Sequence, residues 1–427
     1  MIWKLINYLK KKNIDFKNNR KKNIKNYRSI SFDELFENSS SASNFVVSGA
    51  SKDERNAAIM AYITMIKKYN IPVILLHNYN LELEDEILAN YSNSILFSRR
   101  NLGQIQNQAN YDPFIENDSS VISKILSDVG KKDFNLSSSI SLYFEGMAKY
   151  LMIAKRNPSL PAFFKCPHGS LVSKVQSAVN QGQISPQVGQ DLQFYLASGG
   201  KELGNIKIFL NNLSIEMSPI LSNRLSKKQE SLRSAYNKGY EVISVDLLSS
   251  SESLYTRLLL SELNELYKYG GFAVVIDDIS LTKGEVLTEI LSKPKPNTSF
   301  MIGESDFFSA CANDVQIYES VLGLCHNYLL FNHSSGISRT KWAEFFGKYD
   351  KTKISESSSS GHNIHKWSQI IPGFNSTNTF TYSEDKDYIL SPEDIKKLNR
   401  GEFYFFDGYK SRLVKGCAAN IIPHQTV

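Results

Sequence analysis

The chain contains 427 residues, of which 41% are hydrophobic and 22% are charged, an ordinary composition for a globular protein. This length predicts two or three structural units. No apolar run approaches the roughly 20 residues that span a bilayer, and no secretory signal is visible, so we expect a soluble cytoplasmic protein. The four cysteines show no CxxC spacing, which indicates reduced thiols rather than a disulfide framework or a metal site.

The net charge of +6 is concentrated near the N-terminus. Residues 1–28 contain ten Lys or Arg and one Asp, a local charge of +9, so the remaining residues carry −3. Apolar side chains between residues 2 and 9 share one helical face, which predicts a short helix in an anionic membrane interface. The tail residues assigned to this role are Trp3, Lys10, Lys11, Lys12, Arg20, Lys21 and Lys22. A basic arm on nucleic acid and a solvated leader without structure are the alternatives.

Residues 1–43 form this basic amphipathic tail and a linker, and the folded body begins at the apolar run 45–48. The next segment repeats isoleucine at i, i+4 and i+7, which predicts a helix with one apolar stripe; short buried strands follow at 71–76 and 95–97. A strand, a helix and a second strand imply a right-handed parallel crossover. Residues 44–117 are therefore expected to be the first part of an α/β domain.

Helical periodicity dominates residues 118–238, where strand signals are scarce. We interpret this segment as an all-α insertion, which serves either for partner recognition or as a helical cap over the sheet. Within it, Cys166-Pro167-His168 could form half of a metal site. Because no second ligand pair accompanies it, a structural turn at the surface is the preferred interpretation.

Strand signals return at 241–248, 272–278, 299–305 and 328–333, so residues 239–427 are expected to complete the α/β domain. The segment 355–387 is rich in Ser, Thr and Asn without periodicity, which predicts a flexible excursion. Ser391 followed by Pro392 predicts a helix start, and FYFFDGYKSRLVKG predicts a final hairpin.

Two segments carry the layout of a nucleotide site. NFVVSGASKDERNAAIMAYI, residues 44–63, reads as a strand, a turn on glycine and a helix, the arrangement of a phosphate-binding loop. FAVVIDD, residues 272–278, places Asp277 and Asp278 at the carboxyl end of a strand, where α/β sheets bind ligands. Paired acids at a strand end are also common as helix caps or surface residues.

In their order along the chain, these motifs resemble those of the type IV coupling proteins of bacterial conjugation and type IV secretion, within the FtsK/HerA superfamily. The resemblance covers about residues 44–415 and rests on VVSGAS, YDPF, SLYFEGMAKYLM, EVISVDLLSSSESLYTRLLLSEL, SRTKWAEFFGKY and LSPEDIKKLNRGEFYFFDGYKSRLVKG. It implies a RecA-like P-loop fold of the α/β class, with a mainly parallel sheet, helices on both faces and an inserted all-α domain. It also implies oligomeric assembly and a site for ATP and Mg²⁺.

The chain departs from the family pattern GxxxxGK[ST] at the phosphate loop. Gly49 takes the first position, but Glu54 replaces the second glycine, Arg55 the lysine and Asn56 the Ser or Thr. Side chains then enter the space that wraps phosphate, the compact ammonium is lost, and so is the hydroxyl that coordinates Mg²⁺. The degenerate nucleotide-binding set is Gly49, Ala50, Ser51, Arg55 and Asn56. We therefore expect no cofactor, with ATP and Mg²⁺ retained only if the divergent loop still binds them.

The other motor motifs also depart from the family. Asp278 stands where the family has Glu, and Glu304 where it has Gln, so Asp277, Asp278 and Glu304 are degenerate catalytic remnants. Arg257 and Arg339 could act across a subunit boundary as arginine fingers, although surface salt bridges are the commoner role. His362 and His365, without acids or cysteines around them, are expected to be solvated, and no metal site is expected.

The leading hypothesis is a catalytically degenerate relative of the coupling ATPases that acts as a scaffold or adaptor in DNA transfer or secretion. It would assemble with copies of itself or with an active paralogue, receive DNA or a secretion substrate through the all-α domain, and contact the inner face of the cell membrane through the tail. One alternative is an active ATP-dependent DNA translocase with a divergent loop. Another is a basic-tailed DNA- or membrane-binding module that reuses an α/β core.

Overall fold

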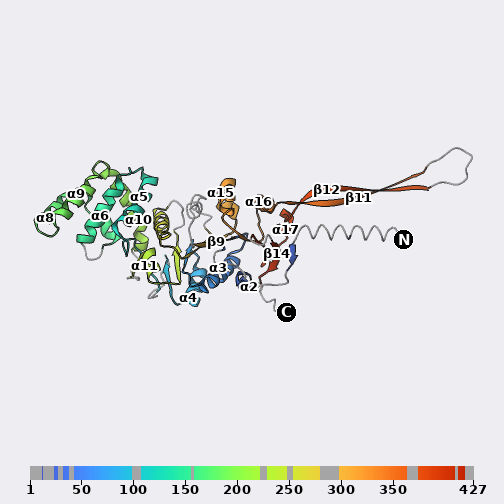
Figure 1. Cartoon of the computed structure of the whole chain (residues 1–427), viewed down its shortest axis with the longest axis horizontal. Coiled ribbons are helices and arrows are strands. Elements are labelled where there is room, and N and C mark those ends of the chain that lie inside the picture. Colours follow the sequence, from blue (N-terminus) through green and yellow to red (C-terminus); the bar gives the residue numbers. More distant parts are fainter. Residues whose placement is uncertain are drawn as a thin grey trace, which may run out of the picture.

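The computed structural model describes residues 12, 24–26, 32–37, 43–98, 107–154, 158–221, 228–247, 253–278, 298–362, 374–408 and 412–418. These residues form an elongated molecule (Figure 1), with a group of helices at one end, a large sheet in the middle and a long hairpin projecting from the other end. The candidate site lies in the sheet domain.

The central sheet has the strand order β1-β14-β13-β10-β2-β9-β8-β3-β7-β4. From β10 to β4 all neighbours pair in parallel, whereas β13 is antiparallel to both β10 and β14. The strand bounds are β1 Ile24–Asn26, β2 Phe45–Ser48, β3 Val73–His77, β4 Ser94–Phe97, β7 Val242–Asp246, β8 Ala273–Asp277, β9 Ser299–Glu304, β10 Asn327–Leu330, β13 Glu402–Asp407 and β14 Arg412–Cys417. Two short strands, β5 Asn110–Tyr111 and β6 Gln229–Glu230, pair separately.

Alternate side chains of the parallel strands enter two different hydrophobic clusters. In β2, Phe45 and Val47 pack on one face and Val46 on the other, and every residue of β2, β3, β7 and β8 is buried. Strands buried on both faces read as continuous apolar runs, which explains why the sequence predicts them clearly. The sheet must therefore carry helices on both sides.

One face of the sheet is covered by α2 Phe32–Glu37, α3 Lys52–Lys67 and α4 Leu81–Asn90. The opposite face is covered by α11 Leu232–Asn237, α12 Leu254–Leu266, α14 Phe307–Ala310, α15 Val315–Leu322 and α16 Gly336–Phe346. The short α17 Pro392–Lys396 begins with the capping box that Ser391 and Asp394 form. Trp342 on α16 is fully buried in an aromatic cluster with Phe307, Tyr318 and Tyr328.

A run of helices lies between the first and second parts of the sheet. These are α5 Ser119–Phe134, α6 Ile140–Ala154, α7 Leu160–Phe164, α8 Leu171–Asn180, α9 Pro186–Ala197 and α10 Leu203–Leu221, with short 3₁₀ helices at His168–Ser170 and Gly200–Glu202. Figure 1 shows them as a separate group at the left of the molecule, which we call the all-α unit. Their core is continuous with the core under α12, so the unit is packed against the sheet domain.

The segment expected to be an irregular excursion differs in the structure. Strands β11 Lys348–His362 and β12 Phe374–Tyr388 pair in antiparallel register over their whole length and project from the body as a hairpin (Figure 1). The hairpin is a two-stranded sheet separate from the central sheet, and its sequence lacks the apolar alternation that marks a half-buried strand. The hairpin is defined by hydrogen bonds between the two backbones, which produce no recognisable pattern of residue types in the sequence.

The other expectations for the fold are confirmed: the sheet is mainly parallel, it has helices on both faces, and an all-α unit is inserted in it. None of the helices in the described part of the chain combines the length and apolar composition needed to cross a bilayer. Most tail residues of interest lie outside the described residues, namely Trp3, Lys10, Lys11, Arg20, Lys21 and Lys22; Lys12 is described and exposed.

Candidate functional site

The loop after β2 is anchored by a buried histidine from the end of β10. Gly49 has φ +80°, and a Cβ there would lie 2.3 Å from His333 Nδ1, so only glycine fits. Burial lowers the pKa of His333 and favours a neutral ring. Nδ1 then donates to Phe331 O at 3.0 Å, and Nε2 accepts from the Ser48 hydroxyl at 2.8 Å. No motif in the sequence predicts this contact.

Helix α3 starts with a closed capping box. Ser51 is the N-cap, and its side chain accepts from Glu54 N while Glu54 Oε2 accepts from Ser51 N at 2.7 Å. The other carboxylate oxygen, Oε1, accepts from Gly401 N at 2.6 Å. The Glu54 side chain is thus buried between the loop and the turn before β13. The Glu54 carboxylate thus accepts a hydrogen bond from the Ser51 amide, which in a phosphate-binding loop would donate to the bound phosphate.

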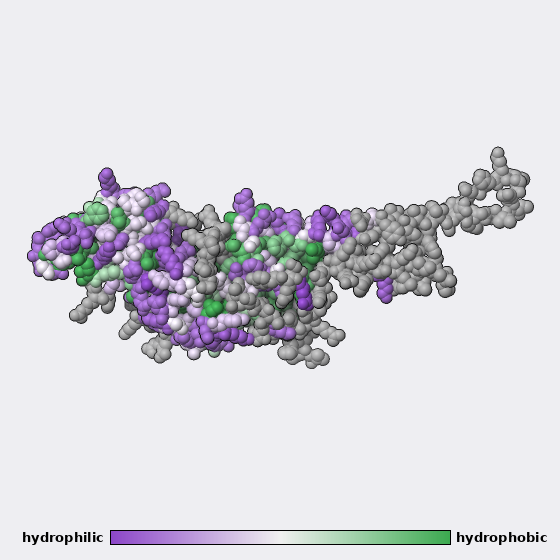
Figure 2. Space-filling model, in the orientation of Figure 1, coloured by the Kyte–Doolittle hydropathy of each residue, from purple (hydrophilic) through white to green (hydrophobic). Residues whose placement is uncertain are grey.

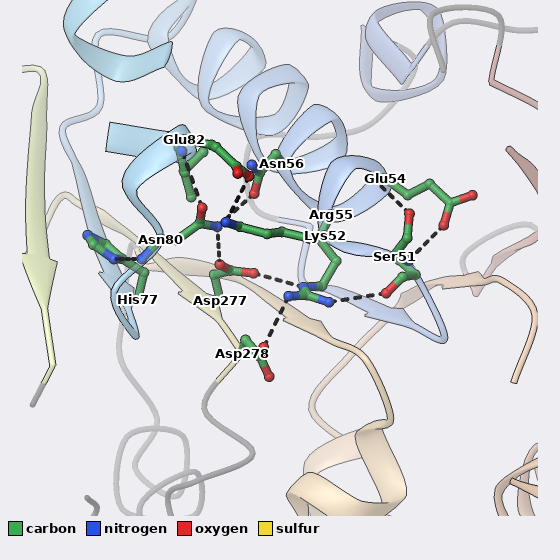
Figure 3. A network of polar contacts seen from close by, with 12 residues as sticks. Ser51, Lys52, Glu54, Arg55, Asn56, His77, Asn80, Glu82, Asp277 and Asp278 are labelled. Atoms are coloured by element: carbon green, nitrogen blue, oxygen red, sulfur yellow. Dashed lines mark hydrogen bonds and ion pairs between the residues drawn. The ribbon is translucent and has the colours of Figure 1, made fainter. Parts of the chain in front are cut away.

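Arg55 crosses from the start of α3 to the acids at the end of β8 (Figure 3). Its Nε donates to Asp277 Oδ1 at 3.0 Å, Nη2 to Asp278 Oδ2 at 3.2 Å, and Nη1 to Ala50 O at 3.1 Å. The side chains of Arg55 and Asp277 are 5% and 1% exposed, whereas that of Asp278 is 39% exposed. The guanidinium therefore fills the space between the loop and the acidic strand end.

Asn80, which follows β3, completes the network on the other side of Asp277 (Figure 3). Its Nδ2 donates to Asp277 Oδ2 and to Asn56 Oδ1, both at 2.7 Å. Its backbone N–H donates to Nδ1 of the buried His77 at 3.1 Å. Each carboxylate oxygen of Asp277 consequently bonds to a donor of the same chain. Asn56, at the position of the Mg²⁺-coordinating hydroxyl, is engaged with a neighbouring amide.

The two remaining charged residues of the loop point away from the network. Lys52 pairs with Glu82 at 2.8 Å, and Asp53 pairs with Arg400; both pairs are at the surface. Such exposed pairs contribute little stability. Of the two acids in the loop, only Glu54 turns inward, and it bonds backbone amides rather than Lys52 or Arg55.

A polyphosphate and its Mg²⁺ do not fit the loop in this arrangement. The Ser51 amide is taken by Glu54, the cation at the lysine position is bonded to Asp277, Asp278 and Ala50, and Asn56 provides no hydroxyl. Among the described residues, no group of three or more His, Cys, Asp or Glu could hold a metal ion. The arrangement is a closed ionic network between the loop and β8.

No model of a known protein family matches the sequence, and no curated protein matches it. Solved structures match the fold. The plasmid coupling protein TrwB in complex with the non-hydrolysable ATP analogue ADPNP is 10% identical, with a TM-score of 0.52 over 93% of this chain and 94% of that chain. The unbound monoclinic form of the bacterial conjugative coupling protein TrwB is 10% identical, with a TM-score of 0.50 over 90% and 86%. VirB4 of Thermoanaerobacter pseudethanolicus is 8% identical, with a TM-score of 0.46 over 92% and 93%.

The chain has the fold of TrwB. This likeness confirms the RecA-like α/β fold that the sequence resemblance implies. In TrwB the fold was solved with an ATP analogue. At 10% identity the likeness concerns the fold alone, so the chemistry of the loop is judged from the residues of this chain.

The structure brings together most of the residues that the sequence nominates. Gly49, Ala50, Ser51, Arg55 and Asn56 lie on the loop and the first turn of α3, beside Asp277 and Asp278. Glu304 is fully buried at the end of β9, in register with Ser48. Asp278 has φ 49°, a left-handed conformation that is strained for a residue with a Cβ.

Sequence reasoning missed Asn80, His77, His333 and Gly401. His77 and Asn80 could have been flagged, because polar residues after a predicted parallel strand lie at the same sheet edge as Asp277. Gly401 is 347 residues from Glu54 and offers no signal. Arg339 donates to His333 O at 2.8 Å within its own chain, and Arg257 lies on α12. The backbone of His362 ends β11, and His365 is outside the described residues.

Proposed function

We propose that the protein is a non-hydrolysing scaffold or adaptor, built on the fold of a coupling ATPase, in a conjugative DNA-transfer or type IV secretion apparatus. The observation that supports the loss of ATPase activity is the buried Arg55–Asp277 pair, in which both carboxylate oxygens bond to the chain itself. The fold of TrwB supports the link to DNA transfer or secretion. The chemistry of the motor is absent, while its architecture is retained.

In this role the sheet domain assembles with copies of itself or with an active paralogue, as the RecA-like fold of an oligomeric motor suggests. The all-α unit receives DNA or a secretion substrate, and the basic tail docks the protein at the inner face of the cell membrane. The local charge of +9 in residues 1–28 supports the docking step, because anionic lipids attract clustered lysines and arginines.

A titration calorimetry experiment with ATP and MgCl₂ tests the proposal. The wild-type chain is expected to show no binding, and a variant with Glu54→Gly, Arg55→Lys and Asn56→Thr is expected to gain it. Removing one carboxylate about 4 Å from a phosphate relieves about 4 kcal/mol at an effective dielectric near 20, roughly a thousandfold in Kd. Lys52→Gly is the matched control: it alters the same loop but leaves Glu54, Arg55 and Asn56, so it should not bind.

Micromolar ATP binding by the wild-type chain would contradict the proposal. DNA-stimulated hydrolysis that Asp277→Ala abolishes would then establish the active translocase. Failure of both the wild-type chain and the rebuilt variant would mean that this strand, turn and helix never served as a nucleotide site.

A further inference from the structure

The all-α unit contains a cavity of about 720 Å³ between the turn that follows α7 and one side of α10. Phe164 at the end of α7 and Pro167 and His168 in the turn line one side, and α10 contributes Lys207, Ile208 and Asn211. This volume is within the range of small-molecule and side-chain binding sites. The cavity is remote from the loop network, because it lies in the helices of the inserted unit.

One nitrogen in this cavity lacks a partner. His168 Nε2 is buried and has no hydrogen-bond partner among the described residues. Its ring packs against Tyr143 and Phe163, with ring centroids 6.3 Å and 6.4 Å away, which fixes the direction of Nε2. The Tyr143 hydroxyl donates to His168 O at 3.4 Å, and we assign Nδ1–H as the donor to the Tyr143 oxygen at 3.2 Å, because this arrangement satisfies both contacts.

This assignment makes Nε2 of His168 a hydrogen-bond acceptor. Burial and the nearby Lys207 lower the pKa of His168 to about 4, so the ring is neutral at pH 7 and carries one proton. With Nδ1 donating to Tyr143, that proton is on Nδ1 and Nε2 carries a lone pair. A buried acceptor without a donor costs free energy, and an N–H supplied by a ligand would recover it.

Lys207 places a cation beside this acceptor. A Cβ added at Gly169 would lie 3.9 Å from Lys207 Nζ, so the ammonium stands over the turn that carries His168. In the described part of the chain Lys207 forms no ion pair, and the lining residues described include no Asp or Glu. Asn211 and Ser214 continue the same side of α10 at i+4 and i+7 from Lys207, and both line the cavity.

Apolar surface adjoins these polar groups. Ile208 lines the cavity and is 56% exposed, and Ile215, one heptad further along α10, is 64% exposed. Figure 2 shows hydrophobic surface, in green, among the polar residues of the all-α unit at the left. Between residues 119 and 221 the sequence has ten Lys or Arg against six Asp or Glu, so the surroundings favour an anion.

We propose that this cavity binds an acidic peptide segment of a protein partner, whose carboxylate pairs with Lys207, whose backbone N–H donates to His168 Nε2, and whose apolar side chain packs against Ile208. The occupant is an acidic peptide segment rather than nucleic acid. Nucleic acid is bound by several cations spaced along phosphates, whereas this cavity offers a single ammonium and apolar walls. The inference refines the partner-binding part of the proposed function and does not depend on the loss of ATP binding.

Methyl NMR on the full chain, with ¹³C-labelled isoleucine, tests the inference. The probe is acetyl-Leu-Glu-Leu-amide, and acetyl-Leu-Gln-Leu-amide and inorganic phosphate are the comparisons. The acidic peptide is expected to shift the Ile208 methyl resonance in a saturable manner. Lys207→Gln and His168→Phe should each weaken binding about tenfold, because the first removes the cation that pairs with the carboxylate and the second removes the acceptor of the backbone N–H. Lys174→Gln, an exposed lysine of α8 that does not line the cavity, should leave binding unchanged.

Equal shifts with the glutamine peptide, or no shift with the glutamate peptide, would overturn the inference. Phosphate that binds as well as the acidic peptide would overturn it too, because the ligand would then be a phosphate group. These failures differ from failure of the proposed function, which is decided by the ATP titration on residues of another domain.

Discussion

Arg55, at the position of the lysine in the phosphate-loop pattern, bonds to acidic side chains of the chain itself. Burying a guanidinium and a carboxylate is costly unless both are well bonded, and here Arg55 and Asp277 meet that condition through Ala50 and Asn80. The planar guanidinium can bond Asp277, Asp278 and a carbonyl together, which a lysine ammonium on its flexible stem is less suited to do. The arginine therefore serves as an internal cation for the acidic strand end.

Removing one partner of this pair should destabilise the sheet domain strongly. Arg55→Met leaves Asp277 buried without its cation, and Asp277→Asn leaves Arg55 with the partly exposed Asp278 as its remaining anion, each at a cost of about 3–5 kcal/mol. The double variant should cost less than the sum of the two, by roughly 1–3 kcal/mol. Urea unfolding at neutral pH, followed by circular dichroism, measures all three.

The surface pair of Arg400 and Asp53 provides the control for this cycle. Both side chains are more than half exposed, so Arg400→Met should change the free energy of unfolding by no more than about 1 kcal/mol. Additive effects of Arg55→Met and Asp277→Asn would show that the two side chains are not coupled, and that the loop is held by other contacts.

Sequence reasoning reached part of this site and stopped for physical reasons. Arg55 and Asp277 could be nominated because each belongs to a local motif, a loop before a helix and acids after an apolar strand. Their contact follows from strand order, since β9 and β2 bring the loop beside β8. Asn80 sits in no motif, and the bond from Gly401 to Glu54 depends on the last turn before β13. Such long-range contacts produce no periodic pattern in the sequence.

Among the helices and strands, too, some could be predicted from the sequence and others could not. Strands β2, β3 and β8 are recognisable from the sequence because burial on both faces requires continuous apolar runs. Hairpin β11–β12 is not recognisable, because its two strands pair outside the central sheet and their sequence shows no apolar alternation. The YDPF segment, residues 111–114, in contrast connects two elements. Asp112 accepts from Phe114 N within the turn and from Leu160 N at the start of α7.

Asp112 gives this connection a dependence on pH. Burial raises the pKa of its carboxyl to about 7, against the opposing effect of the bonds from Phe114 and Leu160. At pH values between the pKa of Asp112 in the unfolded chain and its pKa in the folded chain, Asp112 is protonated in the folded chain and ionised in the unfolded chain. The free energy of unfolding therefore falls as pH rises through this range. Asp112→Asn keeps the acceptor oxygen and cannot ionise. Its stability relative to wild type should increase from pH 5 to pH 8 by about 2–3 kcal/mol.

Urea titrations of wild type and Asp112→Asn at several pH values between these limits measure the effect. The difference between the two proteins is the relevant quantity, because Glu262 is also buried with a raised pKa and affects both. Parallel profiles for the two proteins would mean that Asp112 is ionised throughout and that its backbone donors outweigh its burial.

For the whole molecule, the distribution of charge separates the tail from the body. Residues 1–28 carry +9 and the remainder −3, so electrostatic attraction to an anionic surface belongs to the tail, while the body is weakly repelled. The cavity of the all-α unit is a local exception, because its lining carries the ammonium of Lys207. The proposed function uses this separation, because the tail would dock at the membrane and leave the sheet domain and the all-α unit available to protein partners.

Deleting residues 1–28 should abolish binding to vesicles that contain phosphatidylserine, as measured by cosedimentation. Each lysine near an anionic surface contributes about 1 kcal/mol, so replacing Lys10, Lys11 and Lys12 together by glutamine should weaken binding by roughly two orders of magnitude. Trp3→Ala should weaken it at high salt as well, because salt does not screen the burial of an apolar indole ring in the interface. If the truncated chain still binds vesicles, the body holds the membrane site. If the full chain binds duplex DNA in preference to vesicles, with a steep salt dependence that the deletion removes, the tail is a nucleic-acid arm instead.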